Sequence, residues 1–418
     1  MNEKLLHTPE GVRDIYEAEL KKRFKVLNHI HHVLELYSYQ DIDTPTFEYF
    51  DIFNMDKGSA ASNEMYKFFD RNNNTLVLRP DITPSVARCV AKYYADEKLP
   101  IKLCYNGNTF INAHQHQGKL NECTQIGGEL INDASSASDA EVIACVVSCL
   151  LEVGLKEFQI EIGQVDYFKG LIAEAGIDKE TERKIRNYIK LKNFFGLSEF
   201  VSTLDISDNM KKALSSFDNL FGGLEMLDVA ATFVTNEKSI AAIERMKKVY
   251  NALVSYGFEK YIGFDLSMLN GYNYYTGIVF RGYTYGTGNA IVKGGRYDNL
   301  LSQFGKDAPS VGFAIYVDEL MNALSRNKIE IDVDYSNVLV LYERENQQAA
   351  ISLATKLRQA ERKIELVRKS DKHTIEDYIE YAKKMRFSNI YSLIDDDELV
   401  DISVNDALKT NRKITDLM

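Results

Sequence analysis

The stretch between Tyr167 and Tyr250 most constrains the fold, because it contains no proline and has the charge-rich, helical pattern of residues. Strand-like segments lie on either side of it, EFQIEIGQV over 157–165 and YIGFDLS over 261–267. A helical segment of this length between two sets of strands departs from a simple alternation of elements. The sequence therefore predicts a mainly helical insertion between strands.

The N-terminal part begins with a predicted helix and continues with short strands. Residues 16–37 carry apolar side chains three and four positions apart, the stripe of an amphipathic helix: Phe24, Leu27, Ile30, Leu34 and Tyr37. The pattern then changes to near-alternation, and Pro45 restricts Thr44 to extended geometry, which predicts a strand that ends at the proline. The segment 66–78 predicts a hairpin with its turn at 72–74.

More strands and helices are expected in the middle of the chain. Two strands, 101–107 and 121–131, surround a loop and are followed by a helix over 138–152. The glycine-rich stretch 285–295 lies between strands and does not open a helix, so it predicts a hairpin and not a nucleotide-binding loop. The segment VGFAIYVDELMNALS over 311–325 is expected to be a helix.

The C-terminal part has a different organisation. After a polar connector over 328–335, strand-like and helical segments alternate: NVLVLY, NQQAAISLATKLRQA, KIELVR, TIEDYIEYAKKM and NIYSLID. This alternation is typical of a small, separate α/β domain with a mostly parallel sheet.

Composition limits the location and the partners. No window approaches the roughly 18 apolar residues of a membrane span, and the first residues lack the apolar segment of a secretory signal, so we expect a cytoplasmic protein and no membrane. The five cysteines are an odd number without a zinc pattern, and we expect buried thiols. The net charge of −11 and the absence of a basic stripe make a nucleic-acid partner unlikely.

Two pairs of polar residues are candidates for a binding site, and each pair has a structural alternative. Asp81 and Thr83 lie between a strand and a helix, so they could bind an ammonium group or cap that helix. Gln125 and Glu129 lie four residues apart in a strand, so their side chains point to the same face of a sheet. They could line a polar pocket or lie exposed to solvent.

Two further pairs are less specific. Tyr274 and Tyr275 could supply a hydroxyl group and an aromatic wall, although tyrosines in strands often only pack. His114 and His116 form a His-Gln-His sequence in a loop, which is far more often a solvated loop than a metal site. We expect no metal and no cofactor.

Seven separated segments together resemble the histidyl-tRNA synthetases: TPEGVRD, TPTFEYFDIF, LRPDITPSVAR, QIGGE, GYNYYTGIVF, GGRYDNL and VGFAIYVDEL. Their order and spacing agree with that family over essentially the whole chain. The resemblance implies an α+β fold, the antiparallel sheet flanked by helices of class II aminoacyl-tRNA synthetases, with the Pro45 segment at a homodimer interface. It also implies four parts: the first part of the core over 1–166, a mainly helical insertion over 167–255, the second part of the core over 256–327, and over 335–418 a C-terminal α/β domain resembling an anticodon-binding domain.

The resemblance also implies a histidine-like pocket in which the residues that hold amino and imidazole groups are kept: Asp81, Thr83, Gln125, Glu129, Tyr274 and Tyr275. Three arginines that act on ATP or on the activated amino acid are replaced, by Ile111, Asn270 and Glu319. Losing three charge-assisted hydrogen bonds forfeits on the order of 5 to 9 kcal/mol of phosphate binding. Lys119, Lys293 and Arg296 are poor substitutes, because lysine lacks the bidentate fork and Arg296 belongs to a structural motif.

This pattern resembles the regulatory subunits of ATP phosphoribosyltransferase, which do not aminoacylate. The resemblance implies a regulatory role without catalysis, a short catalytic partner chain that performs the first step of histidine biosynthesis, inhibition by histidine as an allosteric ligand, and a homodimer within a larger hetero-oligomer. A divergent histidyl-tRNA synthetase is the main alternative, and an RNA-binding module is a third. Because Ile111 and Asn270 also remove arginines that would meet a carboxylate, the affinity for free histidine stays open.

Overall fold

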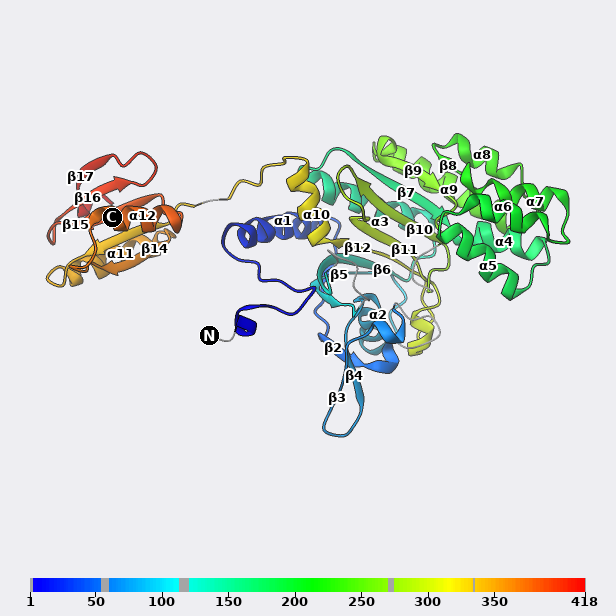
Figure 1. Cartoon of the computed structure of the whole chain (residues 1–418), viewed down its shortest axis with the longest axis horizontal. Coiled ribbons are helices and arrows are strands. Elements are labelled where there is room, and N and C mark those ends of the chain that lie inside the picture. The colour runs from blue at the N-terminus through cyan, green and yellow to red at the C-terminus, as the bar shows by residue number, and fades with distance from the viewer. Residues whose placement is uncertain (1–2, 54–59, 113–119, 270–273, 334, 418) are drawn as a thin grey trace. The chain divides into compact units, whose positions relative to one another are not determined.

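The computed structural model describes residues 3–53, 60–112, 120–269, 274–333 and 335–417. The chain forms two compact units, Met1–Ile331 and Asp332–Met418 (Figure 1). The first unit contains a large sheet, a small sheet and most of the helices, and the second contains a sheet of its own.

A predominantly antiparallel sheet organises the first unit, with strand order β1-β5-β6-β12-β11-β10-β7-β9-β8. The strands are β1 Gln40–Asp41, β5 Ile101–Phe110, β6 Glu122–Ile131, β7 Phe158–Gln164, β8 Phe221–Gly222, β9 Ile262–Asp265, β10 Ile278–Thr284, β11 Val292–Arg296 and β12 Ser310–Tyr316. Neighbouring strands are antiparallel except for the pairs β1 with β5 and β7 with β9. The predicted fold class, an antiparallel sheet flanked by helices, is confirmed.

The prediction of a helix over 311–325 is wrong in its first half. Residues 310–316 form β12, which pairs with β6 on one side and with β11 on the other, and the helix α10 Val317–Arg326 begins only afterwards. The two neighbouring strands satisfy the backbone hydrogen bonds of this segment. Phe313 and Ile315 meanwhile alternate into the core with the period of a strand.

Helices pack on both faces of this sheet. The helices α1 Glu17–Leu36 and α3 Ser136–Glu152 share a core with Ile126 and Leu130 of β6. The helix α2 Thr83–Tyr93 packs with Leu103 of β5 on the opposite face. Because side chains alternate along a strand, Gln125 and Glu129 point to the face that α2 covers.

A small antiparallel sheet follows the first strand. Its strands β2 Phe47–Tyr49, β3 Lys67–Phe69 and β4 Thr75–Leu78 have the order β2-β4-β3, and the β3–β4 hairpin projects from the unit in Figure 1. The hairpin predicted over 66–78 is confirmed. The strand predicted to end at Pro45 is wrong in extent: β1 ends at Asp41 and β2 begins at Phe47. Proline cannot donate a hydrogen bond to a ladder, so pairing stops around it.

The helices α4 to α9 lie together beside β7, β8 and β9 in Figure 1. They are α4 Val165–Glu174, α5 Lys179–Lys190, α6 Phe194–Ser202, α7 Asp208–Ser215, α8 Glu225–Ala231 and α9 Glu237–Ser255. Side chains cap several of their N-termini: Asp178 accepts hydrogen bonds from two backbone N–H groups of α5, and Asn236 accepts one from α9. These caps satisfy donors that the first turn of a helix leaves unpaired.

The second unit has a sheet with the order β14-β13-β15-β16-β17. Its elements are β13 Val338–Tyr342, α11 Gln347–Gln359, β14 Ile364–Arg368, α12 Ile375–Lys384, β15 Asn389–Leu393, β16 Glu398–Ser403 and β17 Lys409–Lys413. β13 pairs in parallel with β14 and β15, but β16 and β17 add antiparallel pairs. The sheet is therefore mixed and not mostly parallel, because short turns after β15 return the chain as hairpins.

All five cysteines are free thiols. Cys104, Cys145 and Cys149 are buried as predicted, whereas Cys89 and Cys123 are only partly buried. Among the described residues, none of the helices combines the length and the apolar character needed to cross a membrane.

Candidate functional site

A buried acid pocket lies on the face of the sheet that α2 covers. Glu129 of β6 is 1% exposed, and its Oε1 accepts a hydrogen bond of 2.6 Å from the hydroxyl of Thr83. The phenol of Tyr297 donates to the other oxygen, Oε2. Both oxygens therefore have protein donors, and the alternative of a solvent-exposed Glu129 is wrong.

Asp81 forms the second acid of this pocket. Its Oδ2 accepts a hydrogen bond of 2.9 Å from the phenol of Tyr274, and its Oδ1 accepts one of 3.4 Å from the backbone N–H of Thr83. The alternative that these two residues only cap α2 is wrong for Thr83, because its hydroxyl donates to Glu129. It holds in part for Asp81, which accepts a hydrogen bond from the first backbone N–H of α2. Tyr274 does more than pack, because its hydroxyl contacts an acid.

Burial gives the two acids different charges at neutral pH. It raises the pKa of Glu129 to about 8, against the opposing hydrogen bonds from Thr83 and Tyr297. Burial also raises the pKa of Asp81, to about 6, and the hydrogen bond from Tyr274 opposes this rise. Asp81 is therefore mostly ionised at neutral pH, while Glu129 is mostly protonated. The pocket offers one negative charge and one neutral carboxyl group.

The raised pKa of Glu129 predicts a loss of stability as the pH rises. The folded protein binds this proton more tightly than the unfolded chain, whose carboxyl group has a pKa near 4.5. The contribution is complete below about pH 4.5 and disappears as the pH passes about 8, at a cost of about 1.4 kcal/mol of unfolding free energy for each pH unit between. We expect urea denaturation of the wild type and of Glu129→Gln at a series of pH values to measure this contribution to the unfolding free energy.

The comparison with Glu129→Gln isolates this group, because the other titrating residues are common to both proteins. We expect the wild type to lose more stability than Glu129→Gln between about pH 5 and pH 8. Parallel stability curves for the two proteins would show that Glu129 does not hold its proton in this range.

Glycine residues keep the backbone close to the acids. A Cβ atom on Gly312 of β12 would overlap the Glu129 carboxylate, and one on Gly295 of β11 would lie 2.8 Å from the ring of Tyr275. Both positions therefore exclude larger residues. The acid pocket itself has a volume of about 10 Å³, the space of about one water molecule, so side chains must move before it admits a larger group.

A larger cleft adjoins the acid pocket on the same face. Its volume is about 340 Å³, within the range of small-molecule sites, and its lining includes Gln125, Tyr275, Lys293 and Tyr316. Gln125 is 2% exposed, so the alternative of an exposed strand residue is wrong here too. Among the described residues its Oε1 has no hydrogen-bond partner. This orphaned acceptor points to a ligand that donates a hydrogen bond.

Two of the positions where the resemblance implies arginines, Ile111 and Glu319, lie in this region. Ile111 lines the cleft and is 36% exposed, so an apolar side chain stands where the resemblance implies a cation. Glu319 lines the adjoining cavity of about 460 Å³ and accepts a hydrogen bond of 2.8 Å from the side chain of Asn289. Asn270 lies outside the described residues, as do Lys119 and the pair His114 and His116.

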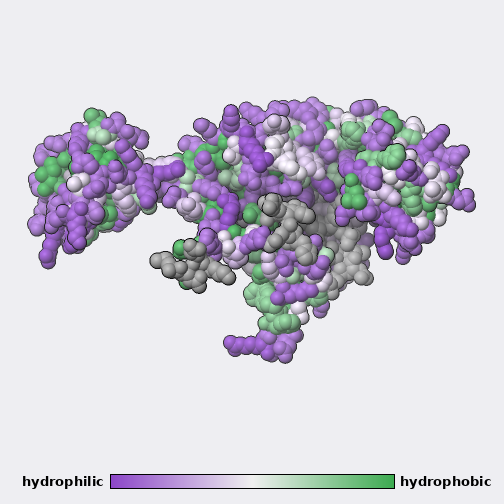
Figure 2. Space-filling model, in the orientation of Figure 1, coloured by the Kyte–Doolittle hydropathy of each residue, from purple (hydrophilic) through white to green (hydrophobic). Residues whose placement is uncertain are grey.

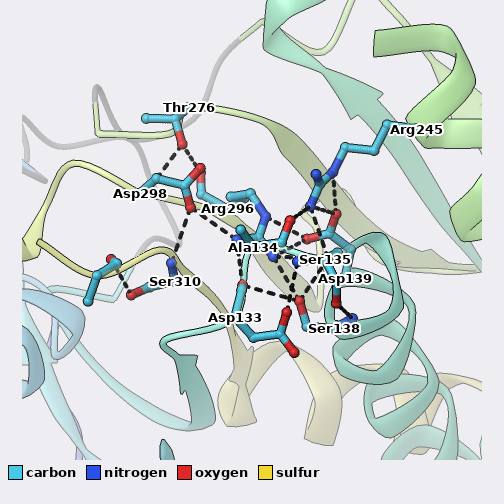
Figure 3. Close-up of polar contacts among 11 residues, drawn as sticks. Asp133, Ala134, Ser135, Ser138, Asp139, Arg245, Thr276, Arg296, Asp298 and Ser310 are labelled. Carbon is cyan, nitrogen blue, oxygen red and sulfur yellow. Dashed lines mark hydrogen bonds and ion pairs between the residues drawn. The ribbon is translucent and has the colours of Figure 1, made fainter. Parts of the chain in front are cut away.

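Arg296 is not available to a ligand, because its guanidinium is held in a buried network (Figure 3). Its Nε donates to Asp139 Oδ1 over 2.8 Å, and its two terminal nitrogens contact Asp133, Asp298 and Ser138. Arg245 of α9 donates to the other oxygen of Asp139 over 2.7 Å. Figure 3 shows the carboxylate of Asp139 between the two guanidinium groups. The hydrogen bonds of this network connect α3, β11 and α9.

Sequence patterns missed two site residues. Tyr297, which donates to Glu129, belongs to the segment GGRYDNL, in which the spacing of the side chains does not indicate a binding site. Arg281 of β10 lines the cleft because the register of the β10–β11 pair places it opposite Lys293. Register of this kind depends on turns and packing that the local pattern leaves undefined.

One group of described residues has potential metal-ligand atoms that lie within 4.8 Å of one another: His31, Asp41 and Cys104. Asp41 Oδ1 accepts hydrogen bonds from His31 Nε2 over 2.7 Å and from the thiol of Cys104 over 3.4 Å. Burial and the neighbouring Asp41 raise the pKa of Cys104 to about 12, so the thiol keeps its proton. The group is already a complete hydrogen-bonded cluster that links α1, β1 and β5.

Known protein families match most of the chain. The family described as Histidyl-tRNA synthetase matches residues 11–320. A protein of Ruminiclostridium cellulolyticum named ATP phosphoribosyltransferase regulatory subunit is 41% identical over 360 residues, which are 86% of each chain. The protein of the same name from Acetivibrio thermocellus is 36% identical over 96% of this chain and 95% of its own.

Solved structures agree with this match. The crystal structure of an ATP phosphoribosyltransferase regulatory subunit/histidyl-tRNA synthetase from Bacillus halodurans has a TM-score of 0.84 and 31% identity, over 93% of this chain and 98% of that one. Histidyl-tRNA synthetase from Nostoc has a TM-score of 0.80 over 98% of both chains, and at 19% identity this likeness concerns the fold alone.

Proposed function

The chain belongs to the family of ATP phosphoribosyltransferase regulatory subunits, and we propose that it regulates a short catalytic ATP phosphoribosyltransferase chain in the first step of histidine biosynthesis. The observation that carries this proposal is the combination of an acid pocket at Asp81 and Glu129 with a cleft lined by Ile111 and an adjoining cavity lined by Glu319. The resemblance to the synthetases implies arginines at these two positions. The names of the relatives support the same role.

The charges in the cleft support a role without aminoacylation. Adenylate formation depends on donors held ready for the charge that develops on the phosphates, and removing one such donor typically costs about 100-fold or more in rate. Ile111 offers no donor, and the negative charge of Glu319 repels phosphate. The chain is therefore a regulatory subunit without aminoacylation activity of its own.

Histidine is the ligand that the site favours. Ionised Asp81 suits a cationic group, the neutral carboxyl of Glu129 can exchange hydrogen bonds with a ring nitrogen, and the acceptor of Gln125 faces the cleft. Binding at this site would regulate the catalytic chain through a coupling free energy between the pocket and the subunit interface. Inhibition of the assembly by histidine follows from such coupling.

A homodimer within the larger hetero-oligomer is supported by an apolar surface on the small sheet. Phe47 and Tyr49 of β2 and Phe69 of β3 are 52%, 56% and 69% exposed. Figure 2 shows hydrophobic residues gathered over this sheet, with a hydrophilic tip on the hairpin. The sheet directly follows Pro45, so we place the dimer interface on this surface.

Charged residues on this surface are expected to separate the dimer. Phe47→Glu combined with Phe69→Glu would bury two unpaired carboxylates at the interface, which we expect to weaken dimerisation by about 100-fold or more. Analytical ultracentrifugation measures the change. The control is Phe195→Glu on α6, whose residue is 77% exposed outside the small sheet. A double variant that stays dimeric at the same concentrations would place the interface elsewhere.

Reconstitution with a short catalytic chain tests the proposed function. The two purified proteins are mixed, and phosphoribosyl transfer to ATP is measured with and without L-histidine. We expect the two chains to co-purify, the catalytic chain to gain activity in the assembly, and L-histidine to reduce that activity. Absence of both association and activation would refute the proposal. The divergent histidyl-tRNA synthetase remains the alternative.

A further inference from the structure

Arg281 and Lys293 form a pair of cations on the floor of the cleft. Arg281 of β10 lies directly opposite Lys293 of β11 in the antiparallel register, so both side chains lie on the same face of the sheet. Both line the cleft of about 340 Å³ and the adjoining cavity. Their strands are paired neighbours in the interior of the sheet, and this pairing fixes the separation of the two backbones.

The row of residues across the strands at this level has an excess of positive charge. The register joins Tyr105, Gly127, Ala314, Lys293, Arg281 and Glu161 across the sheet. Two cations and one carboxylate therefore share the row, and like charges directly opposite each other are unfavourable. Lys293 Nζ also lies 4.6 Å from the centre of the Tyr316 ring.

Small residues, Gly127 and Ala314, lie beside the cations in the same row. A Cβ atom on Gly127 would collide with the carbonyl oxygen of Phe313, so this position accepts only glycine. The phenol of Tyr105 fills the space over Gly127, whereas Ala314 presents only a methyl group next to Lys293 in the acid pocket. The opening beside the cations is the cleft that Arg281 and Lys293 themselves line.

The cations lie one row away from the acids. Glu129 is two residues from Gly127 along β6, a rise of about 7 Å in a strand. Lys293 lines the acid pocket as well as the cleft, and its charge acts to lower the pKa of Asp81. Lys293 therefore borders both the space beside Asp81 and the cleft that Arg281 lines.

We propose that Arg281 and Lys293 bind the α-carboxylate of the amino-acid ligand, while Asp81 faces its cationic group. This inference rests on the proposed function, because it assigns the ligand of the same site. The pair would take over the contact with the ligand carboxylate, and not the contacts with ATP phosphates, that the resemblance implies for arginines at Ile111 and Asn270. The guanidinium of Arg281 can hold both carboxylate oxygens, and the ammonium of Lys293 adds a third donor.

A comparison of L-histidine with L-histidinol measures the contribution of the carboxylate to binding, because histidinol lacks this group and keeps the amino and imidazole groups. Calorimetric titration of the full-length protein measures both affinities. We expect the wild type to prefer histidine by about tenfold or more, the contribution of a charge-assisted hydrogen bond. In Arg281→Gln and Lys293→Gln the preference should fall several-fold, and in the double variant it should vanish with histidinol affinity little changed.

The matched control is Lys247→Gln, which removes a cation that pairs with Asp228 on the helical insertion. It should keep the wild-type preference. A double variant that still prefers histidine, or a wild type that binds the two ligands equally, would overturn the carboxylate assignment and leave the proposed function intact. A wild type that binds neither ligand would instead contradict the proposed function. Urea denaturation confirms that each variant is folded.

Discussion

Asp81→Asn is expected to weaken L-histidine binding at neutral pH by about 30-fold or more. Asp81 is 2% exposed and ionised at this pH, so it would be the buried counter-charge of the ligand cation. Removing one member of a buried, hydrogen-bonded charge pair typically costs about 2 to 5 kcal/mol. Asparagine keeps the shape, but its single carbonyl oxygen can keep only one of the hydrogen bonds that Asp81 accepts from Tyr274 and from the backbone N–H of Thr83. Isothermal titration calorimetry measures the loss.

Tyr274→Phe is the matched control for this prediction. The phenol of Tyr274 lowers the pKa of Asp81, so its removal should let Asp81 take up a proton at a higher pH than in the wild type. We expect Tyr274→Phe to bind L-histidine nearly normally at high pH and to lose affinity earlier on acidification. An Asp81→Asn protein with wild-type affinity would show that the ligand cation lies elsewhere.

Asp139→Ala is expected to lower the free energy of unfolding by about 3 to 5 kcal/mol, the usual effect of removing one partner from a buried ion pair. Asp139 is fully buried between Arg245 and Arg296, and alanine would leave two guanidinium groups without their shared anion. Because Arg245 lies on α9, the helical insertion should also lose one of its polar contacts with α3. Urea denaturation of the full chain measures the difference from wild type.

Asp298→Asn is the control for Asp139→Ala. Asp298 contacts the same guanidinium of Arg296 over 3.0 Å, but its side chain is 37% exposed. Solvent screens the lost charge, and asparagine keeps an acceptor, so we expect a loss below about 1 kcal/mol. Equal urea midpoints for the two variants would contradict a structural role for the buried Asp139 network.

Much of the fold follows from local pattern. The helix α1, the β3–β4 hairpin and the strands β5 and β6 are encoded by apolar spacing and turn residues within a few positions of one another. The wrong prediction of one continuous helix over 311–325 has a physical cause. β12 and α10 follow each other without a break, and a short apolar run looks alike in a buried strand and in a helix. The pairing of β12 with β11 and with β6, which lies far away in the sequence, decides between them.

The candidate site was predictable only in part. The shared face of Gln125 and Glu129 follows from strand spacing alone, and the structure places both side chains there. The burial of Glu129 and its contacts with Thr83 and Tyr297 depend on residues 46 and 168 positions away in the chain. The role of Arg281 depends on the β10–β11 register. Long-range packing of this kind has no local signature.

Histidine-dependent exchange of pyrophosphate into ATP tests the central claim most directly, which is that an amino-acid pocket persists here without the cations that adenylation needs. The purified chain is assayed beside an active histidyl-tRNA synthetase, in a preparation whose histidine binding has been measured by calorimetry. We predict histidine binding with no exchange above background. Steady exchange that depends on both histidine and ATP would contradict the account and identify the chain as an enzyme.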